Sequence, residues 1–161
     1  MTSLLHSLGS HNFSGTGAFA LSDLKRYSPE EIRVTIQALM AEDRNDLALA
    51  LGEAGVSLHP ASEDMLAVTG LLAMTQQDWG CAIERLTELK AIQGERVQAF
   101  THLMLTRAHR CDLDPAAALD AVVQGLAQFH GDADLQQQFN ELTDDKQQPF
   151  SAVHADLSSN N

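Results

Sequence analysis

Histidine and cysteine are the residue types in this 161-residue chain that most readily hold a metal ion. His102 and His109 lie seven residues apart on one predicted helix, with Cys111 close behind them. Two helical turns separate the two histidines by about 10 Å, whereas a zinc–nitrogen bond is about 2.1 Å long. One ion therefore cannot bind both side chains. We expect surface or half-buried histidines, with no metal and no cofactor.

Paired carboxylates are the second candidate chemistry, and they occur as Glu30-Glu31, Glu63-Asp64 and Asp144-Asp145. Neighbours on a helix point in different directions, so such pairs do not act together as acid and base. The first two pairs fall in predicted first turns, where negative charge stabilises the helix dipole. The sequence also lacks the HExxH, P-loop and nucleophile-elbow motifs. These observations predict a protein that is not an enzyme.

The stretch Gly15-Thr16-Gly17-Ala18-Phe19-Ala20 matches the letters of a dinucleotide-binding GxGxxA motif. A pyrophosphate site needs a buried strand before the glycines and a helix after them. The preceding His11-Asn12-Phe13-Ser14 has no such apolar run. We interpret the motif as part of a flexible N-terminal arm, residues 1–27, with a short helix at residues 18–27.

The amino-acid composition limits which kinds of partner and which cellular compartment are expected. The formal net charge is −12, from 22 acidic and 10 basic residues, which argues against nucleic acid and membrane surfaces as partners. No apolar stretch approaches the roughly 20 residues that cross a bilayer, and the first residues do not resemble a signal peptide, so a cytoplasmic location is expected. Cys81 and Cys111 form no CxxC motif, and two buried reduced thiols are expected; a disulfide stays open.

A short sequence motif recurs three times along the chain and indicates which helices carry the residues discussed above. Ala48, Ala82 and Ala118 recur 34 and 36 residues apart, each soon after a polar turn. A period of this length is typical of stacked helix pairs. Helix signals agree with it, since capping residues stand at the expected helix starts and Pro or Gly at the expected ends: Ser28 with Glu31, Ser62, Asp78, Asp114 and Asp132 for the starts, and His59-Pro60, Gly94 and Gly131 for the ends.

Seven helices are therefore predicted, without any β-sheet, in one repeat domain at residues 28–146. A polar tail at residues 147–161 follows, and its composition predicts disorder.

The unit at residues 63–94 resembles a tetratricopeptide repeat. It has Gly70 on its first helix, Ala82 twelve residues later, and a turn Gln77-Asp78-Trp79 before its second helix. The units at 29–60 and about 99–131 match less fully, with Gly52 and Gly55 in place of larger residues in the former. The resemblance implies an all-α, right-handed stack of antiparallel helix pairs, about three repeats and a capping helix. Another helical-hairpin repeat and a plain helical bundle are the alternatives.

In that family the first helix of each pair lines a concave groove. The resemblance implies that the groove residues here are Arg33, Gln37 and Met40, then Asp64, Ala67, Leu71 and Met74, then Leu103, Arg107 and Arg110. Such a lining is apolar in the middle with arginines at both ends. Arginine binds carboxylates bidentately, and Met and Leu accept apolar side chains. Alternatively, the arginines pair with acids on neighbouring helices.

The predicted function is a non-enzymatic interaction module, an adaptor or scaffold that binds a peptide or client protein in the groove. Its partner would be another protein, not nucleic acid or a membrane. In size, charge and repeat number the chain is also similar to cytoplasmic chaperones of bacterial secretion systems. A self-assembling structural module and an accessory enzyme subunit are further alternatives. The oligomeric state stays open, with a dimer as one option.

Overall fold

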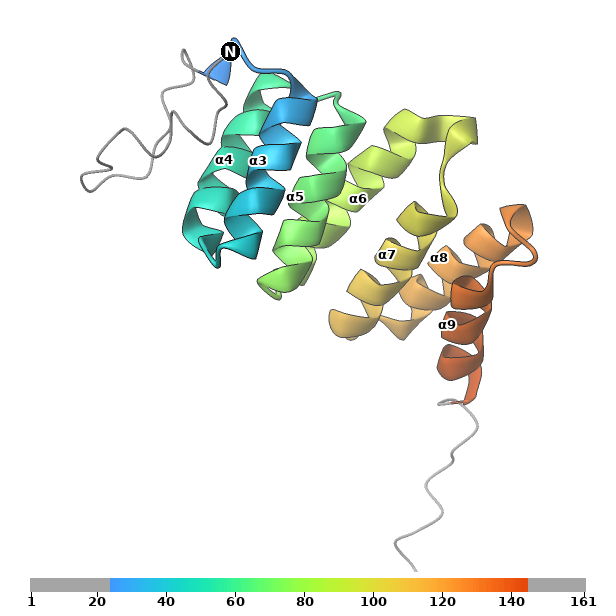
Figure 1. The fold of residues 1–161 in the computed structure, drawn as a ribbon. Coiled ribbons are helices and arrows are strands. Elements are labelled where there is room, and N and C mark those ends of the chain that lie inside the picture. The colour runs from blue at the N-terminus through green and yellow to red at the C-terminus, as the bar shows by residue number, and fades with distance from the viewer. Residues whose placement is uncertain (1–23, 145–161) are drawn as a thin grey trace, which may run out of the picture.

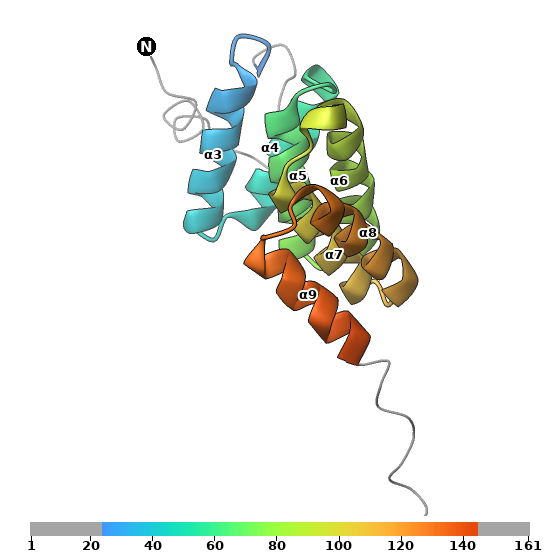
Figure 2. The same ribbon diagram turned by 90° about the vertical axis from the view of Figure 1, so that its right-hand side faces the viewer.

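A computed structural model describes residues 24–144, and these residues form a row of helix hairpins (Figure 1). The α-helices are α3 (Pro29–Ala41), α4 (Asn45–Leu58), α5 (Glu63–Thr75), α6 (Trp79–Gln93), α7 (Ala99–Cys111), α8 (Pro115–Gln128) and α9 (Ala133–Asp144), and the 3-10 turn η1 (Gly94–Arg96) follows α6. Residues 24–144 contain no strand. In each hairpin the first helix lies toward one side of the row and the second toward the other (Figure 2). The predicted all-α stack is confirmed.

The predicted arm at residues 1–27 and the predicted tail at 147–161 lie almost entirely outside the described residues. Of the arm, only residues 24–27 are described, and Leu24 is buried in the core of the first hairpin. The predicted helix at residues 18–27 and the glycine motif therefore stay untested.

Local capping fixes where most helices begin. The Ser28 hydroxyl accepts a hydrogen bond from the Glu31 backbone N–H (3.2 Å), and the Glu31 carboxylate accepts one from the Ser28 N–H (2.8 Å). Carboxylates of Asp78, Asp114 and Asp132 accept in the same way from the N–H three residues later, at 3.1, 3.0 and 2.9 Å. These bonds satisfy N–H groups that have no partner inside the helix, and they confirm the predicted starts.

The turn inside each hairpin is the same in all three repeats. Its central residue has a positive φ, and the next N–H bonds the carbonyl five residues back at 2.9 Å, as in a Schellman motif. The central residues are Asp43, Gln77 and Leu113, with φ of 58°, 61° and 61°. They recur at the spacing of the three alanines, 34 and 36 residues, so the repeat seen in the sequence is a repeat of backbone conformation.

Small residues stand where the two helices of a hairpin cross. Ala48, Ala82 and Ala118 are all fully buried. In the middle hairpin, a Cβ on Gly70 would lie only 3.0 Å from Leu86 Cγ. The two helices of this hairpin therefore pack closely against each other at their small residues, as the repeat pattern predicts.

Contacts between successive hairpins are uneven. Gly55 and Gly125 hold the same place in the first and third repeats. A Cβ on Gly55 would lie 2.6 Å from Met65 Sδ of α5, and a Cβ on Gly125 would lie 3.0 Å from Leu135 Cδ1 of α9. The equivalent residue of the second repeat is Leu89, which fills its site and is buried. Because α6 runs longer and η1 follows it, the second and third hairpins are joined by two extra residues. The longer connection between the second and third hairpins therefore occurs in the repeat that has Leu89 in place of a glycine.

Two predicted helix ends differ in detail from the structure. Gly94 is the C-cap of α6, as predicted, but its φ of 55° and ψ of −122° are not those of a left-handed cap, and the 3-10 turn begins at this residue. Gly131 does not end α8, because the helix ends at Gln128 and Phe129 is its C-cap. The Phe129 N–H still bonds the Gly125 carbonyl at 2.8 Å, and the His59 N–H bonds the Gly55 carbonyl at 2.9 Å at the equivalent end of α4.

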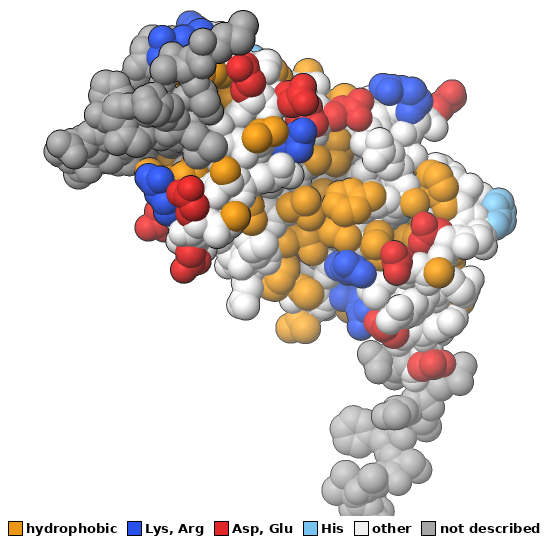
Figure 3. Space-filling view, in the orientation of Figure 1, with side chains coloured by type: hydrophobic (Ala, Val, Ile, Leu, Met, Phe, Trp, Pro, Cys, Tyr) orange, Lys and Arg blue, Asp and Glu red, His pale blue; other side chains and the backbone are white. Residues whose placement is uncertain are grey.

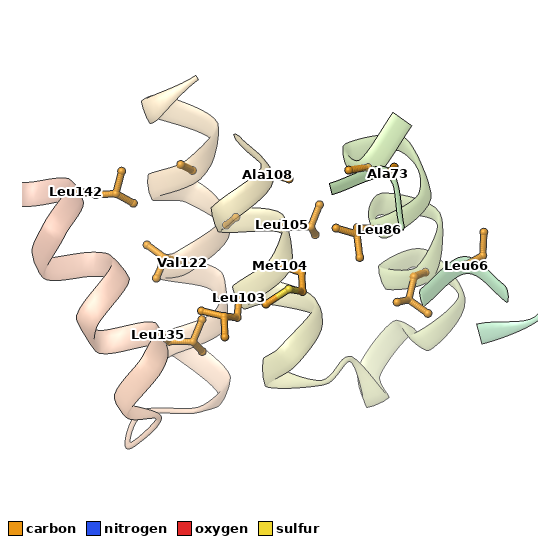
Figure 4. Packing of buried hydrophobic residues seen from close by; sticks show 14 residues of the cluster. Leu66, Ala73, Leu86, Leu103, Met104, Leu105, Ala108, Val122, Leu135 and Leu142 are labelled. Carbon is orange, nitrogen blue, oxygen red and sulfur yellow. The ribbon is translucent and has the colours of Figure 1, made fainter. Parts of the chain in front are cut away.

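The core consists of two clusters that meet in α5. Met65, Val68 and Leu72 of α5 pack with α3 and α4, while Leu66 and Ala73 pack with α6 to α9. In the second cluster, side chains from α7, α8 and α9 converge on one another and on Leu86 of α6 (Figure 4). The stack therefore has no single centre, and each hairpin is stabilised by its neighbours.

Candidate functional site

An open hollow of about 690 Å³ lies where the first helices of the three repeats end. Hydrophobic side chains gather over the middle of this face of the molecule, and Lys or Arg groups border them (Figure 3). The lining consists of the last turns of α3, α5 and α7, the start of α6 and one residue of α9: Met40, Leu71, Met74, Thr75, Trp79, Met104, Arg107, Arg110, Cys111 and Gln138.

Uneven spacing of the first helices explains why the hollow opens here. Helix α3 packs directly against α5, whereas α5 and α7 share almost no close backbone contact. The two extra residues between α6 and α7 separate the second and third repeats. Side chains from α5 and α7 therefore line a gap instead of packing on each other.

Methionine dominates the apolar part of the lining. Met40, Met74 and Met104 come from three different helices, and they are three of the four methionines in the described residues. Leu71 and Trp79 add half-buried apolar surface. Methionine side chains are unbranched and polarizable, so a surface made of them adapts to differently shaped apolar groups.

The three arginines predicted for the groove have different partners. Arg33 pairs with Asp64 of α5 (Nε–Oδ1 3.4 Å). Arg110 donates to Gln138 Oε1 at 2.7 Å and forms an ion pair with Glu141 of α9. Hydrogen bonds from Gln137 and then from Arg110 hold the pKa of the Glu141 carboxyl below its ordinary value.

Arg107 is the exception. It is exposed, lines the hollow, and makes no ion pair or hydrogen bond with any residue in the described range. The alternative that arginines pair with neighbouring acids thus holds for Arg33 and Arg110. Arg107 forms no ion pair within residues 24–144, although its charge helps to lower the pKa of the Glu141 carboxyl on α9.

No family model matches the sequence, and no curated protein matches it. Solved structures do. The N-terminal domain of stress-induced protein-1 (STI-1) from C. elegans superposes with a TM-score of 0.63 at 14% identity, over 78% of this chain and 99% of that domain. The Sgt2 TPR domain from Aspergillus fumigatus superposes with a TM-score of 0.66, also at 14% identity, over 81% of this chain and 90% of that chain. The chain has a tetratricopeptide-repeat fold.

Side chains of α5 explain why the first repeat has two glycines in its second helix. Gly52 and Gly55 stand where larger core residues are usual, and the structure shows what fills the space. A Cβ on Gly52 would lie 2.9 Å from Thr69 Cγ2, and one on Gly55 would meet Met65. Side chains of α5 therefore occupy the volume that the glycines leave.

The predicted groove residues fall into three groups in this tetratricopeptide stack. Met40, Leu71, Met74, Arg107 and Arg110 line the hollow together. Arg33, Gln37 and Asp64 form a separate polar cluster on α3 and α5, in which Arg33 donates to Gln37 Oε1 at 3.2 Å.

Ala67 and Leu103 form the third group. Leu103 is only 8% exposed within the second core cluster, and the half-buried Ala67 packs against that cluster without lining the hollow. Met104 takes the place expected of Leu103, since one residue along a helix turns the side chain by about 100°.

Sequence reasoning missed several lining residues: Thr75, Trp79, Met104, Cys111 and Gln138. A signal existed for Met104, which stands three residues before Arg107 and therefore shares its face of α7. Gln138 carried no such signal, because it reaches the hollow from the capping helix.

Two expectations about cysteine and histidine are wrong in part. Both thiols are free, but Cys111 is exposed and only Cys81 is half-buried. Burial, and then the charge of Asp78, raise the pKa of the Cys81 thiol. Among residues 24–144, no group of three or more His, Cys, Asp or Glu side chains could hold a metal ion.

His102 is fully buried, although surface or half-buried histidines were expected. The missing side chain of Gly125 leaves room for its ring, which packs edge-on against Phe129 with the centroids 6.5 Å apart. Neither ring nitrogen makes a hydrogen bond of ordinary geometry within the described residues. Burial, followed by the charge of Lys90, lowers the pKa of His102, and a weak polar contact with the Ala121 backbone opposes the shift.

Among the helices of residues 24–144, none is long and apolar enough to cross a bilayer.

Proposed function

We propose that this protein is a non-enzymatic interaction module that binds a peptide or a segment of a client protein in the hollow. The observation that carries the proposal is an open apolar surface lined by three methionines, with the unpaired Arg107 at its edge. Apolar surface that stays open to water in this way marks interaction sites. The tetratricopeptide fold, shared with the STI-1 and Sgt2 domains, supports the proposal.

The charges define the kind of segment that fits. The chain carries a net charge of −12, so its surface repels nucleic acid and anionic lipid. At the hollow, however, Arg107 and Arg110 provide local positive charge. A segment with apolar side chains and at least one carboxylate matches both the methionines and Arg107.

A charge-reversal experiment tests this proposal. The double variant Arg107→Glu, Met74→Glu should lose the client while keeping its helical content in circular dichroism. The control variant, Arg96→Glu with Val123→Glu, makes the same change in charge at exposed positions that do not line the hollow. A client is then a protein that wild type and control capture and the groove variant does not. Capture by a well-folded groove variant would contradict the proposal.

Other functions lead to different outcomes. A cytoplasmic secretion chaperone would be one client-binding protein of this kind, and the client's identity would show whether it is exported. A self-assembling module would instead gain mass with concentration in light scattering. An accessory enzyme subunit would change the activity of the protein that it captures.

A further inference from the structure

The described chain ends beside the hollow. Gln138 of α9 lines it, and Arg110 holds Glu141 of the same helix in an ion pair. From Gln138 to the last residue of α9, Asp144, the helix rises about 9 Å. Figure 1 shows α3, α5, α7 and α9 running in the same direction, so that all four end on the same side of the molecule.

The sequence that follows α9 contains apolar side chains and a carboxylate, which complement the methionines and Arg107 of the hollow. Phe150, Val153 and Leu157 are spaced three and four residues apart, which places side chains on one face of a helix. Pro149 precedes them and suits a first helical turn. Asp156 adds a carboxylate within the same stretch.

The connection is long enough for this segment to return to the hollow. The chain from Asp144 to Phe150 spans at most about 20 Å when extended, more than the rise between Gln138 and Asp144. The other end of the chain is less well placed. Leu24 packs near the start of α3, and Pro29 to Met40 along that helix measures about 16 Å.

We propose that residues 149–157 dock in the hollow of their own molecule, with Phe150, Val153 and Leu157 against the methionines and Asp156 beside Arg107. The docked segment covers the surface that a client would bind. A short connection keeps the segment at an effective concentration on the order of millimolar, so weak contacts are enough to occupy the hollow. The competition with a client, though not the docking, rests on the proposed function.

The only tryptophan of the chain, Trp79, lines the hollow and reports its occupancy. The experiment compares wild type with the full-length triple variant Phe150→Ser, Val153→Ser, Leu157→Ser. The variant should show Trp79 emission shifted to longer wavelength and stronger quenching by acrylamide, because water and quencher reach the uncovered indole. Adding a peptide of residues 147–161 to the variant should reverse both changes.

Controls separate this segment from other occupants. The variant Leu4→Ser, Leu5→Ser, Leu8→Ser makes matched changes at the opposite end of the chain, and its Trp79 signal should equal that of wild type. A signal that changes here and not in the triple variant would overturn the proposal in favour of the N-terminal residues. The wild-type signal should also be the same at low and high protein concentration. Loss of protection on dilution would overturn it in favour of a second copy.

Unchanged Trp79 emission in the triple variant, with helical content intact, would overturn the docking outright. The single variant Phe150→Ser gives the same readout if the triple variant folds poorly. No client is needed for these measurements, so they stand apart from the test of the proposed function. If the protein captures a client but its tail does not cover Trp79, the docking proposal is wrong and the proposed function still stands.

Discussion

Gly125 lies where α8 packs against α7, its partner in the third hairpin, and against the capping helix α9. A Cβ on Gly125 would lie 2.9 Å from His102 Cβ and 3.0 Å from Leu135 Cδ1. His102 Cβ cannot move without shifting α7, so the space cannot open cheaply. We expect Gly125→Ala to destabilise the protein by about 1–2 kcal/mol, because overpacking outweighs the usual gain of Ala over Gly in a helix. Urea unfolding followed by circular dichroism measures the change.

Gly80 provides the matched control for this substitution. It lies in the first turn of α6, and a Cβ there would meet only Asp78 Oδ1, at 4.0 Å. Gly80→Ala should therefore stabilise the protein, by up to about 1 kcal/mol. A Gly125→Ala variant as stable as Gly80→Ala would show that α8 does not approach α7 so closely.

Buried His102 makes stability depend on pH. Burial lowers its pKa in the folded state below the ordinary value of 6.5. Below pH 6.5 the unfolded chain therefore binds a proton that the folded chain does not, and stability falls as the pH drops toward the lowered pKa. His102→Leu should reduce this loss of stability, measured as the free energy of unfolding on either side of pH 6.5.

The exposed His130 is the control for that experiment. His130→Leu should keep the pH dependence of wild type, because its ring takes no part in the core. If His102→Leu loses as much stability on acidification as wild type does, another group sets the pH response.

At the scale of the helices, α4 is the one second helix of a hairpin whose N-cap residue makes no side-chain capping bond. Asp78 and Asp114 cap α6 and α8, but the equivalent residue before α4 is Arg44, which makes no capping bond. We expect Arg44→Ser to stabilise the protein by about 0.5–1 kcal/mol, since serine can accept from a first-turn N–H. The lost ion pair with Glu42 is exposed and worth little. Thermal unfolding measures the gain.

The reverse change tests the same principle at an existing cap. Asp78→Ala removes the bond from the Cys81 N–H and should destabilise by about 1 kcal/mol. If both variants leave the melting temperature unchanged, capping does not limit the stability of these hairpins.

Helix starts could be predicted from the sequence because the contacts that set them are local. The hydroxyl of Ser28 and the carboxylate of Asp78 each bond an N–H three residues away. The groove register could not be predicted as well. Whether Leu103 or Met104 faces the hollow depends on how far α7 stands from α5, and the extra residues around Gly94 change that distance.

Burial of His102 was hidden from the sequence for a similar reason. The ring depends on space left by Gly125, which lies on the next helix. A residue of the same type at His109 is only half-buried. Residue type and spacing along one helix therefore could not separate the two histidines, because the difference arises from packing between helices.

At the scale of the whole molecule, the core consists of two clusters that meet in α5. We therefore expect a core substitution to destabilise mainly the adjacent helices and not the whole stack equally. Leu135→Ala removes a fully buried side chain of the second cluster and should destabilise by about 2–5 kcal/mol. In a repeat stack the effect passes mainly to adjacent units. Hydrogen exchange should therefore speed up in α7, α8 and α9, while amides of α3 and α4 stay protected.

Leu51→Ala is the matched change in the first cluster, since Leu51 is also fully buried. It should speed exchange in α3, α4 and α5 and spare α8 and α9. Equal acceleration along the whole stack by both variants would instead show one cooperative unit. The distinction matters for the hollow, because α3 and α5 line one side of it and α7 and α9 the other. A segment bound in the hollow would contact helices of both clusters. It should therefore slow amide hydrogen exchange at both ends of the stack, although the two ends open separately without it.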